Sequence, residues 1–129
     1  MDTKDHRLVL CDFGSAKKLN PYESSIAYIC SRYYRAPELI LGAKEYGCEI
    51  DVWSMGCVIA EMFIGDPIFI GNSNKEQFLR IIQIIGVPTD RDYAAMGYQG
   101  RLNIPKMSFI GLRNKIKGID PLALDLLSK

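Results

Sequence analysis

The first residues in the chain that could do chemistry are Asp12, Phe13 and Gly14, which follow a short apolar run. A carboxylate at the end of a strand can bind a hard divalent cation, because magnesium prefers oxygen ligands and keeps several of its waters. Asp and Gly are also common turn residues, so the same tripeptide could simply end the strand. Taken alone, the tripeptide leaves both interpretations open.

Two more motifs follow in a fixed order. After a stretch of 21 residues (15–35) comes Ala36-Pro37-Glu38, and after it Asp51-Val52-Trp53-Ser54 with Gly56 two residues on. The order D-F-G, loop, A-P-E and D-x-W-S-x-G is very improbable by chance. It is the order of motifs in the C-terminal half of a protein kinase, so the chain resembles that part of the kinase domain.

Short elements must position these motifs. Residues 7–11 (RLVLC) are β-favouring and predict a strand, while 15–35 are polar, rich in tyrosine and without a clear period, which predicts a long loop. Residues 36–41 predict a short helix with proline at its first position and Gly42 after its end. Cys11 and Cys57 lie in apolar runs and are expected to be buried.

A stronger helix is predicted over 49–64, followed by Gly65. Its residues are apolar almost all round, so we expect it to be covered on every side at the centre of a core. Gly56 weakens a helix and suggests that another element approaches closely there.

The C-terminal half predicts two further helices. Ser73 and Glu76 have the spacing of a capping box, which predicts a helix over 73–85. Residues 87–118 contain several glycines and predict an irregular segment. A last helix is expected over 120–129, with no stop signal before Lys129.

Composition excludes several classes of protein. The chain has 129 residues, 48% of them apolar and 24% charged, which indicates one globular domain, and its net charge of +1 gives no electrostatic reason to expect nucleic acid or an anionic membrane as partner. Its single histidine, His6, excludes a His-rich zinc site. No signal peptide or membrane span is expected, and the four cysteines form no C-x-x-C pair, so we expect free thiols and a cytoplasmic or nuclear location.

The resemblance is closest to the glycogen synthase kinase-3 (shaggy-type) serine/threonine kinases. It rests on residues 12–17 (DFGSAK), 28–38 (YICSRYYRAPE) and 67–71 (PIFIG). The resemblance is clear over about 8–90, faint over 91–118 and weak over 119–129. It implies a mainly α fold, the partial C-terminal lobe of the kinase fold, with an activation segment over 12–38 and a family-type insert region over 87–118.

The resemblance implies roles at the nucleotide. Asp12 would bind the Mg²⁺ that bridges the phosphates of ATP, and Cys11 would lie beside it at the floor of the nucleotide pocket, or else be a plain buried thiol. Phe13 would pack against the helix that aligns the site, and Gly14 would let the segment turn.

In the activation segment the resemblance implies that Tyr28 is phosphorylated, with Arg32 and Arg35 as partners of the phosphate. The alternative for these residues is a solvated loop. Lys17 would contribute to an anion pocket that recognises a phosphoserine already present on the protein substrate. Scaffold proteins could bind near 73–110.

Three residues would be architectural. In kinases, the residues matching Glu38 and Asp51 pair with groups that this chain does not contain, so each would be a carboxylate without its mate, and Trp53 belongs to the same central helix. Asp51 could instead be an ordinary acid at a helix N-terminus.

The chain contains no glycine-rich loop, no V-A-I-K lysine and no H-R-D-x-x-x-x-N loop. Phosphoryl transfer depends on positioning and charge stabilisation, so one magnesium ligand is not enough, and we expect no kinase activity from these residues alone. Three hypotheses stay open: part of an active kinase, a catalytically dead module that binds substrates or scaffolds, and a fragment that does not fold by itself because Glu38, Asp51 and the apolar helix lack the groups that would cover them.

Overall fold

The computed structural model describes residues 7–20, 24–100 and 102–129. His6 and the other N-terminal residues from which no signal peptide was expected lie outside the described residues, as do positions 21–23 of the activation segment. The described residues contain no strand. Their elements, in chain order, are the 3-10 turns η1 (Phe13–Ser15) and η2 (Arg32–Tyr34) and the helices α1 (Pro37–Ile40), α2 (Glu49–Ile64), α3 (Asn74–Ile85), α4 (Asp90–Ala95), α5 (Leu112–Lys115) and α6 (Pro121–Leu127). The mainly α architecture agrees with the sequence.

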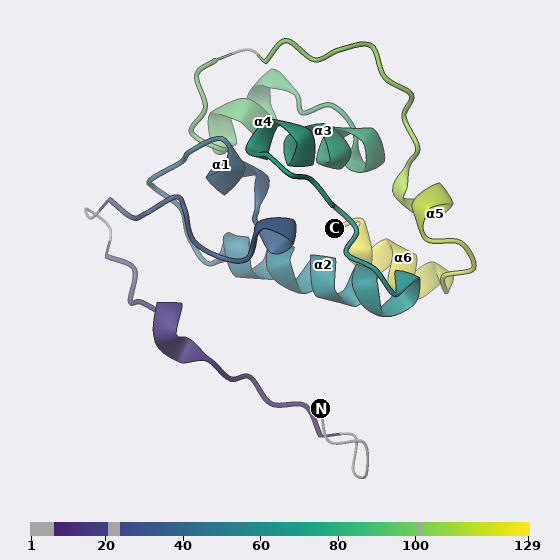
Figure 1. Cartoon of the computed structure of the whole chain (residues 1–129), viewed down its shortest axis with the longest axis horizontal. Coiled ribbons are helices and arrows are strands. Elements are labelled where there is room, and N and C mark those ends of the chain that lie inside the picture. Colours follow the sequence, from purple (N-terminus) through teal and green to yellow (C-terminus); the bar gives the residue numbers. More distant parts are fainter. Residues whose placement is uncertain (1–6, 21–23, 101) are drawn as a thin grey trace.

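Helices α2 and α3 form the centre of the packed part of the chain (Figure 1). Helix α3 contacts α1 and α5, and α2 contacts η2 and α6. The main core collects buried apolar residues from α1 to α4 and from the segments that follow α2 and α5: Ile40, Cys57, Ala60, Ile68, Phe69, Phe78, Ile81, Ile82, Ile84, Tyr93 and Ile116. A smaller cluster of Ala36, Leu39 and Ile50 joins α1 to the start of α2.

The start of α3 is fixed by local chemistry. The Ser73 hydroxyl accepts the N–H of Glu76 at 3.1 Å, and the Glu76 carboxylate accepts the N–H of Asn72 at 3.0 Å, so two backbone donors are satisfied at this end. Gly71 packs against this first turn, because a Cβ there would lie 2.5 Å from the backbone nitrogen of Gln77. The chain can therefore pass close to α3 only with glycine at that position.

The prediction that residues 87–118 are irregular was wrong in two places. Helix α4 starts with a capping box, in which Thr89 and Asp92 satisfy each other's backbone N–H groups, and α5 forms a single turn further on. The T-x-x-D spacing was present in the sequence and is the signal that could have found α4. The last helix is also shorter than expected, because α6 ends at Leu127, where the Ser128 hydroxyl donates to the carbonyl of Asp125.

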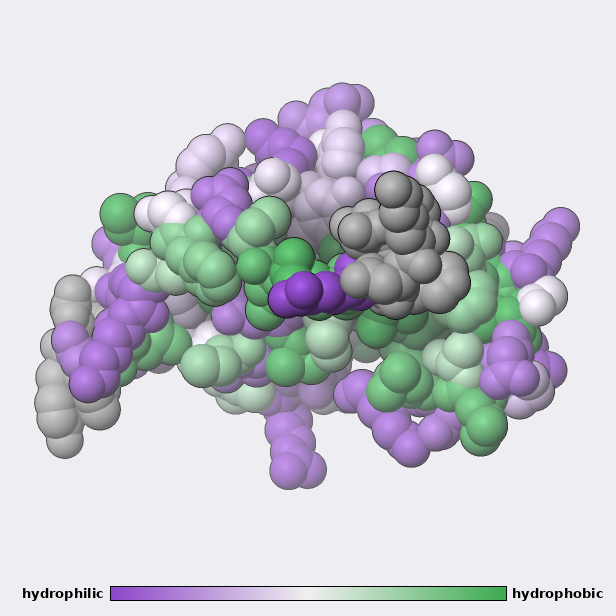
Figure 2. All heavy atoms as spheres, turned by 90° about the horizontal axis from the view of Figure 1, so that it is seen from below, coloured by the Kyte–Doolittle hydropathy of each residue, from purple (hydrophilic) through white to green (hydrophobic). Residues whose placement is uncertain are grey.

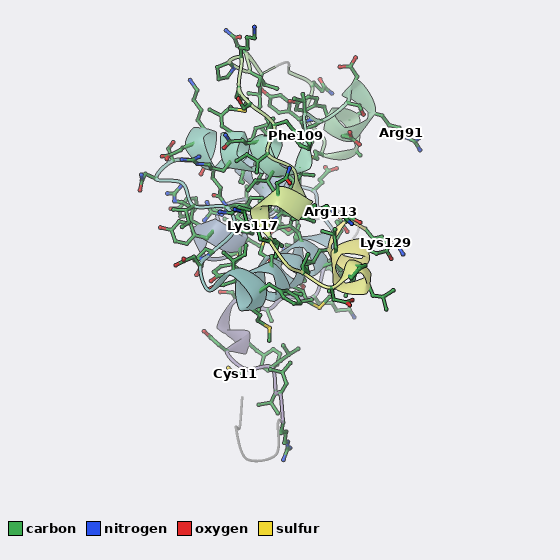
Figure 3. The ribbon with its side chains drawn as sticks, turned by 90° about the vertical axis from the view of Figure 1, so that its right-hand side faces the viewer. Cys11, Arg91, Phe109, Arg113, Lys117 and Lys129 are labelled. Carbon is green, nitrogen blue, oxygen red and sulfur yellow. The ribbon has the colours of Figure 1, made fainter. Side chains whose placement is uncertain are left out.

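The predicted strand over 7–11 is not formed. These residues are exposed and extend away from the helices, and Cys11 lies on this extension rather than in a core (Figures 1 and 3). A strand needs a neighbour to accept and donate its hydrogen bonds, and the described residues offer none. The β-favouring composition of the segment is therefore not enough to fold it.

The expectation that α2 is covered on every side was also wrong. Val52, Met55 and Met62 are 63%, 55% and 74% exposed, whereas Cys57 and Ala60 on the opposite side are buried. Apart from its chain neighbours and the backbone of α2 itself, no described atom lies within 4 Å of a Cβ built on Gly56, so no other element approaches it closely. Figure 2 shows this side of the molecule, where apolar groups gather on the surface. Helix α2 packs by one face only, because the described chain supplies no element for the other.

We therefore expect the 129-residue chain to self-associate. An uncovered apolar helix face is a contact surface in water, so sedimentation velocity should show oligomers whose fraction rises with concentration, and the chain should bind a hydrophobic dye. The triple variant Val52→Thr, Met55→Gln, Met62→Gln should shift the chain toward monomer without loss of helicity. Ile70→Gln, which changes an exposed apolar residue outside α2, is the control. A parent chain that stays monomeric at all concentrations would contradict the interpretation of the exposed α2 face as a contact surface.

Candidate functional site

Asp12 lies at the N-terminal end of η1 with a left-handed backbone (φ 62°, ψ 65°) and an exposed side chain. Its Oδ1 atom is 3.4 Å from the position of a Cβ on Gly14, so glycine leaves room for the carboxylate beside the turn. Phe13, between them, is 68% exposed. The tripeptide thus forms a turn that presents a carboxylate to solvent.

The donor set at Asp12 fits part of a magnesium site. In the described part of the chain, no three His, Cys, Asp or Glu side chains gather as a metal cluster. Magnesium, however, is usually held by one or two carboxylates together with waters and substrate phosphates. A single exposed carboxylate can therefore be one ligand, but it does not make a site by itself.

The other two residues expected near the nucleotide and the substrate are exposed. Cys11 was expected to be buried, and it is not, because the segment before Asp12 does not pack against the helices. Lys17 is exposed on the same extension. All four cysteines are free thiols, and burial raises the pKa of Cys57, the only buried one, to about 12. The structure does not bring Cys11, Asp12 and Lys17 into a common pocket.

Arg35 forms the most organised part of the activation segment. Its side chain is 3% exposed, and its Nε and Nη2 atoms donate to the carbonyls of Ile29 and Cys30 at 2.9 and 3.0 Å. The guanidinium carbon lies 4.3 Å from the centroid of the Tyr28 ring, a cation–π contact. Arg35 therefore fixes the backbone just after Tyr28, and its charged guanidinium group lies against the ring of Tyr28.

Arg32 is placed differently. Its Nη1 donates to the Oδ1 atom of Asn74 at 3.0 Å, and its carbonyl accepts the side-chain amide of Gln77, which is fully buried. These contacts join η2 to the start of α3. Of the two arginines expected to pair with a phosphate on Tyr28, only Arg35 contacts Tyr28 in the structure.

Tyr34 fixes the same segment at a second point, which was not expected from the sequence. The Tyr34 hydroxyl donates to Glu61 Oε2 at 2.7 Å, and the Ser54 hydroxyl lies 2.9 Å from the carbonyl of Tyr34, to which it donates. The hydrogen bond to Glu61 raises the pKa of Tyr34. Ser54 belongs to the D-x-W-S-x-G motif, which was the available signal; nothing local pointed to the pair of Tyr34 and Glu61, which are 27 residues apart.

The three architectural residues have different environments. Glu38 is half-buried, and loss of hydration raises the pKa of its carboxyl. Asp51 is exposed in the first turn of α2, the position of an ordinary N-terminal acid, so the expected cost of burying it does not arise. The ring of Trp53 stacks on Phe69 with centroids 5.5 Å apart, while its Nε1 is buried without a hydrogen-bond partner.

Glu38 gives a pH-dependent prediction. Because its folded pKa lies above the unfolded value, ionisation costs stability, and this cost grows as pH rises from the unfolded pKa through the folded pKa. Glu38→Gln should therefore raise the Tm of the isolated chain by roughly a few degrees at pH 7, and it should leave the Tm unchanged below about pH 4. Glu45→Gln, an exposed change, should have little effect at either pH. A Tm difference that is the same at both pH values would contradict the assignment.

A groove lies beside the end of α3. An open hollow of about 320 Å³ separates the end of α3 from the segment before α5, and its lining is mainly apolar: Ile82, Gln83, Gly86, Val87, Met107 and Phe109. The N–H of Ile110 donates to the carbonyl of Gln83 at 2.8 Å and fixes one wall against the other. This groove falls within 73–110, where scaffold binding is expected.

No helix in the described residues could cross a bilayer.

Comparison with known proteins is consistent with these motifs. The family described as "Protein kinase domain" matches residues 1–115. The protein kinase gsk31 of Schizosaccharomyces pombe is 55% identical over 96 residues, which are 74% of this chain and 25% of that protein. The serine/threonine-protein kinase RIM11/MSD1 of Saccharomyces cerevisiae is 52% identical over 96 residues, 74% of this chain and 26% of that protein. The chain thus spans about a quarter of the length of these relatives.

Proposed function

Because the chain belongs to the protein kinase family, we propose that it is the C-terminal-lobe part of a serine/threonine kinase of the glycogen synthase kinase-3 type. Such a kinase transfers the γ-phosphate of ATP to Ser or Thr hydroxyls of protein substrates. The observation that carries the proposal is Arg35, buried and bonded to two carbonyls of the activation segment while its charge lies under Tyr28. A solvated loop would not bury an arginine in this way.

Asp12 would hold the magnesium ion of this kinase. When bound, Mg²⁺ supplies charge neutralisation on the phosphates of ATP. The chain's contribution is the exposed carboxylate on the turn of η1, with Gly14 leaving space beside it. Cys11 would lie next to the nucleotide.

Tyr28 would be the activating phosphorylation site. A phosphate adds close to two negative charges and three acceptor oxygens. The Nη1 atom of Arg35 is buried and has no hydrogen-bond partner in the described structure, which makes it a suitable donor for that phosphate. Arg32 would have to exchange its bond with Asn74 to join it.

We propose that the isolated chain is inactive, because its sequence contains neither the catalytic loop nor the glycine-rich loop. Its alternative role is that of a binding module for scaffolds or substrates. The groove between α3 and Phe109 favours this second function, because a partner could bind there without ATP.

The proposal can be tested in a grafted kinase, in which the matching segment of the S. pombe relative is replaced by this chain's residues. Lys17→Ala should lower kcat/KM for a peptide carrying a downstream phosphoserine by about tenfold, because an ion pair with the phosphate is lost. The unphosphorylated peptide should be unaffected. Lys18→Ala, one residue on, is the matched control. Equal losses for both peptides would show that Lys17 does not recognise the substrate phosphate.

A further inference from the structure

Arg32 is anchored through its backbone and held more loosely through its side chain. Its carbonyl oxygen accepts the backbone N–H of Arg35 at 3.1 Å and the side-chain amide of Gln77, which is fully buried. Its guanidinium donates through Nη1 to Oδ1 of Asn74 at 3.0 Å, in an exposed contact. The backbone of Arg32 is therefore fixed, whereas its charged end can exchange partners by rotation of the side chain.

Asn74 is placed to receive this guanidinium. It is the first residue of α3, and the hydroxyl of Ser73 caps that helix start. Its Nδ2 atom donates at 3.4 Å to the carbonyl of Ile40 at the end of α1, where helix carbonyls lack partners within the helix. Because the oxygen and nitrogen of an amide are fixed relative to each other, this bond leaves Oδ1 facing Arg32. Asn74 therefore bridges α1 and η2.

Tyr28 lies in the same loop as Arg32. The bonds from Arg35 to the carbonyls of Ile29 and Cys30 close the chain between residues 28 and 35 into one loop. The Tyr28 side chain is 70% exposed, and the guanidinium of Arg35 already lies against its ring. A phosphate added to Tyr28 would thus have one arginine beside it and a second, Arg32, four residues further along the same loop.

A phosphate is a stronger partner for Arg32 than the amide of Asn74. The amide oxygen is neutral and accepts one N–H group of Arg32. A phosphate carries close to two negative charges, and its oxygens can accept two N–H groups of an arginine at once. The exchange from Asn74 to the phosphate is therefore favourable, but it costs the bond to Asn74.

We propose that Asn74 is a positioning residue that competes with a phosphate on Tyr28 for the guanidinium of Arg32. It keeps Arg32 on α3 while Tyr28 is unmodified, and it sets how tightly the phosphate is held after modification. The proposal rests on the proposed phosphorylation of Tyr28 and names a residue that regulates its effect. Asn74→Ala should free Arg32 for the phosphate, whereas Asn74→Asp should retain Arg32 through an ion pair.

The test uses the 129-residue chain with phosphotyrosine incorporated at position 28 during translation, below the concentration at which it self-associates. The first readout is the rate at which a tyrosine phosphatase removes the phosphate, because a phosphate bound by arginines is protected. Relative to the parent, Asn74→Ala should slow removal about threefold and Asn74→Asp should speed it about threefold, the size expected of an exposed contact.

The second readout is the second pKa of the phosphotyrosine, measured by phosphorus NMR. A guanidinium stabilises the phosphate dianion, so this pKa should fall in Asn74→Ala and rise in Asn74→Asp. Asn72→Asp, which adds the same charge on an exposed side chain two residues away, is the control and should change both readouts much less. In the background of Arg32→Ala, the differences among the variants at position 74 should disappear.

Three results would overturn the competition, and one of them reaches further. If Arg32→Ala alters both readouts but Asn74→Ala and Asn74→Asp do not, Asn74 does not compete, and the pairing of the phosphate with arginine still holds. Effects at position 74 that persist in Arg32→Ala would show that Asn74 does not act through Arg32. If neither Arg32→Ala nor Arg35→Lys alters the readouts, arginines do not hold the phosphate, which would also contradict the role proposed for Tyr28.

Discussion

In the grafted kinase, Asp12→Asn is expected to lower kcat by about a hundredfold or more. The amide keeps the size of the side chain but removes the negative charge that would hold magnesium, and loss of a metal contact to the transferred phosphate costs several kcal/mol of transition-state stabilisation. Because Asp12 is exposed on a turn, the substitution should leave the Tm of the grafted kinase nearly unchanged. The measurement is the initial rate of phosphate transfer from ATP to a peptide.

Asp66→Asn makes the same chemical change at an exposed position after α2 and is the matched control. It should keep the parent rate. The magnesium role of Asp12 would be refuted by an Asp12→Asn variant that is as active as the parent over a range of magnesium concentrations.

The second large effect concerns stability. Ile82→Ala should destabilise the isolated chain by about 2–5 kcal/mol, since Ile82 is 2% exposed at the centre of the main core and its truncation leaves a cavity. A loss of this size is a large fraction of the stability of an ordinary domain. Urea unfolding followed by circular dichroism gives the free energy.

Ile85→Ala, on the same helix but 49% exposed, should cost about 1 kcal/mol or less. The comparison requires that the parent chain unfolds cooperatively, which would also exclude the hypothesis that it does not fold alone. Equal effects of the two substitutions, or a parent without a transition, would contradict the core described for α3.

The helices with strong local signals were predictable from sequence. The range expected for α2 is the range observed, and α3 begins after Ser73 as its capping residues indicated. Local chemistry decides such ends, so a single sequence is enough. The mainly α class follows from the same signals.

The errors arose where a neighbour decides the outcome. The apolar composition of residues 7–11 and of α2 was interpreted as burial, but burial requires a partner surface, and the described chain supplies one for only part of α2. In the candidate site, the motifs pointed to Asp12 and Tyr28 but not to what holds them. The bonds of Arg35 to backbone carbonyls and of Tyr34 to Glu61 depend on tertiary structure, which spacing along the chain does not encode.

The kinase assignment predicts that this chain can serve as the matching part of a working kinase. The grafted kinase should transfer the γ-phosphate of labelled ATP to a peptide serine at a rate within about tenfold of the S. pombe parent, and the 129-residue chain alone should transfer none. A grafted kinase that folds cooperatively and binds ATP, yet leaves the peptide unlabelled, would contradict the assignment of these residues to a working kinase domain.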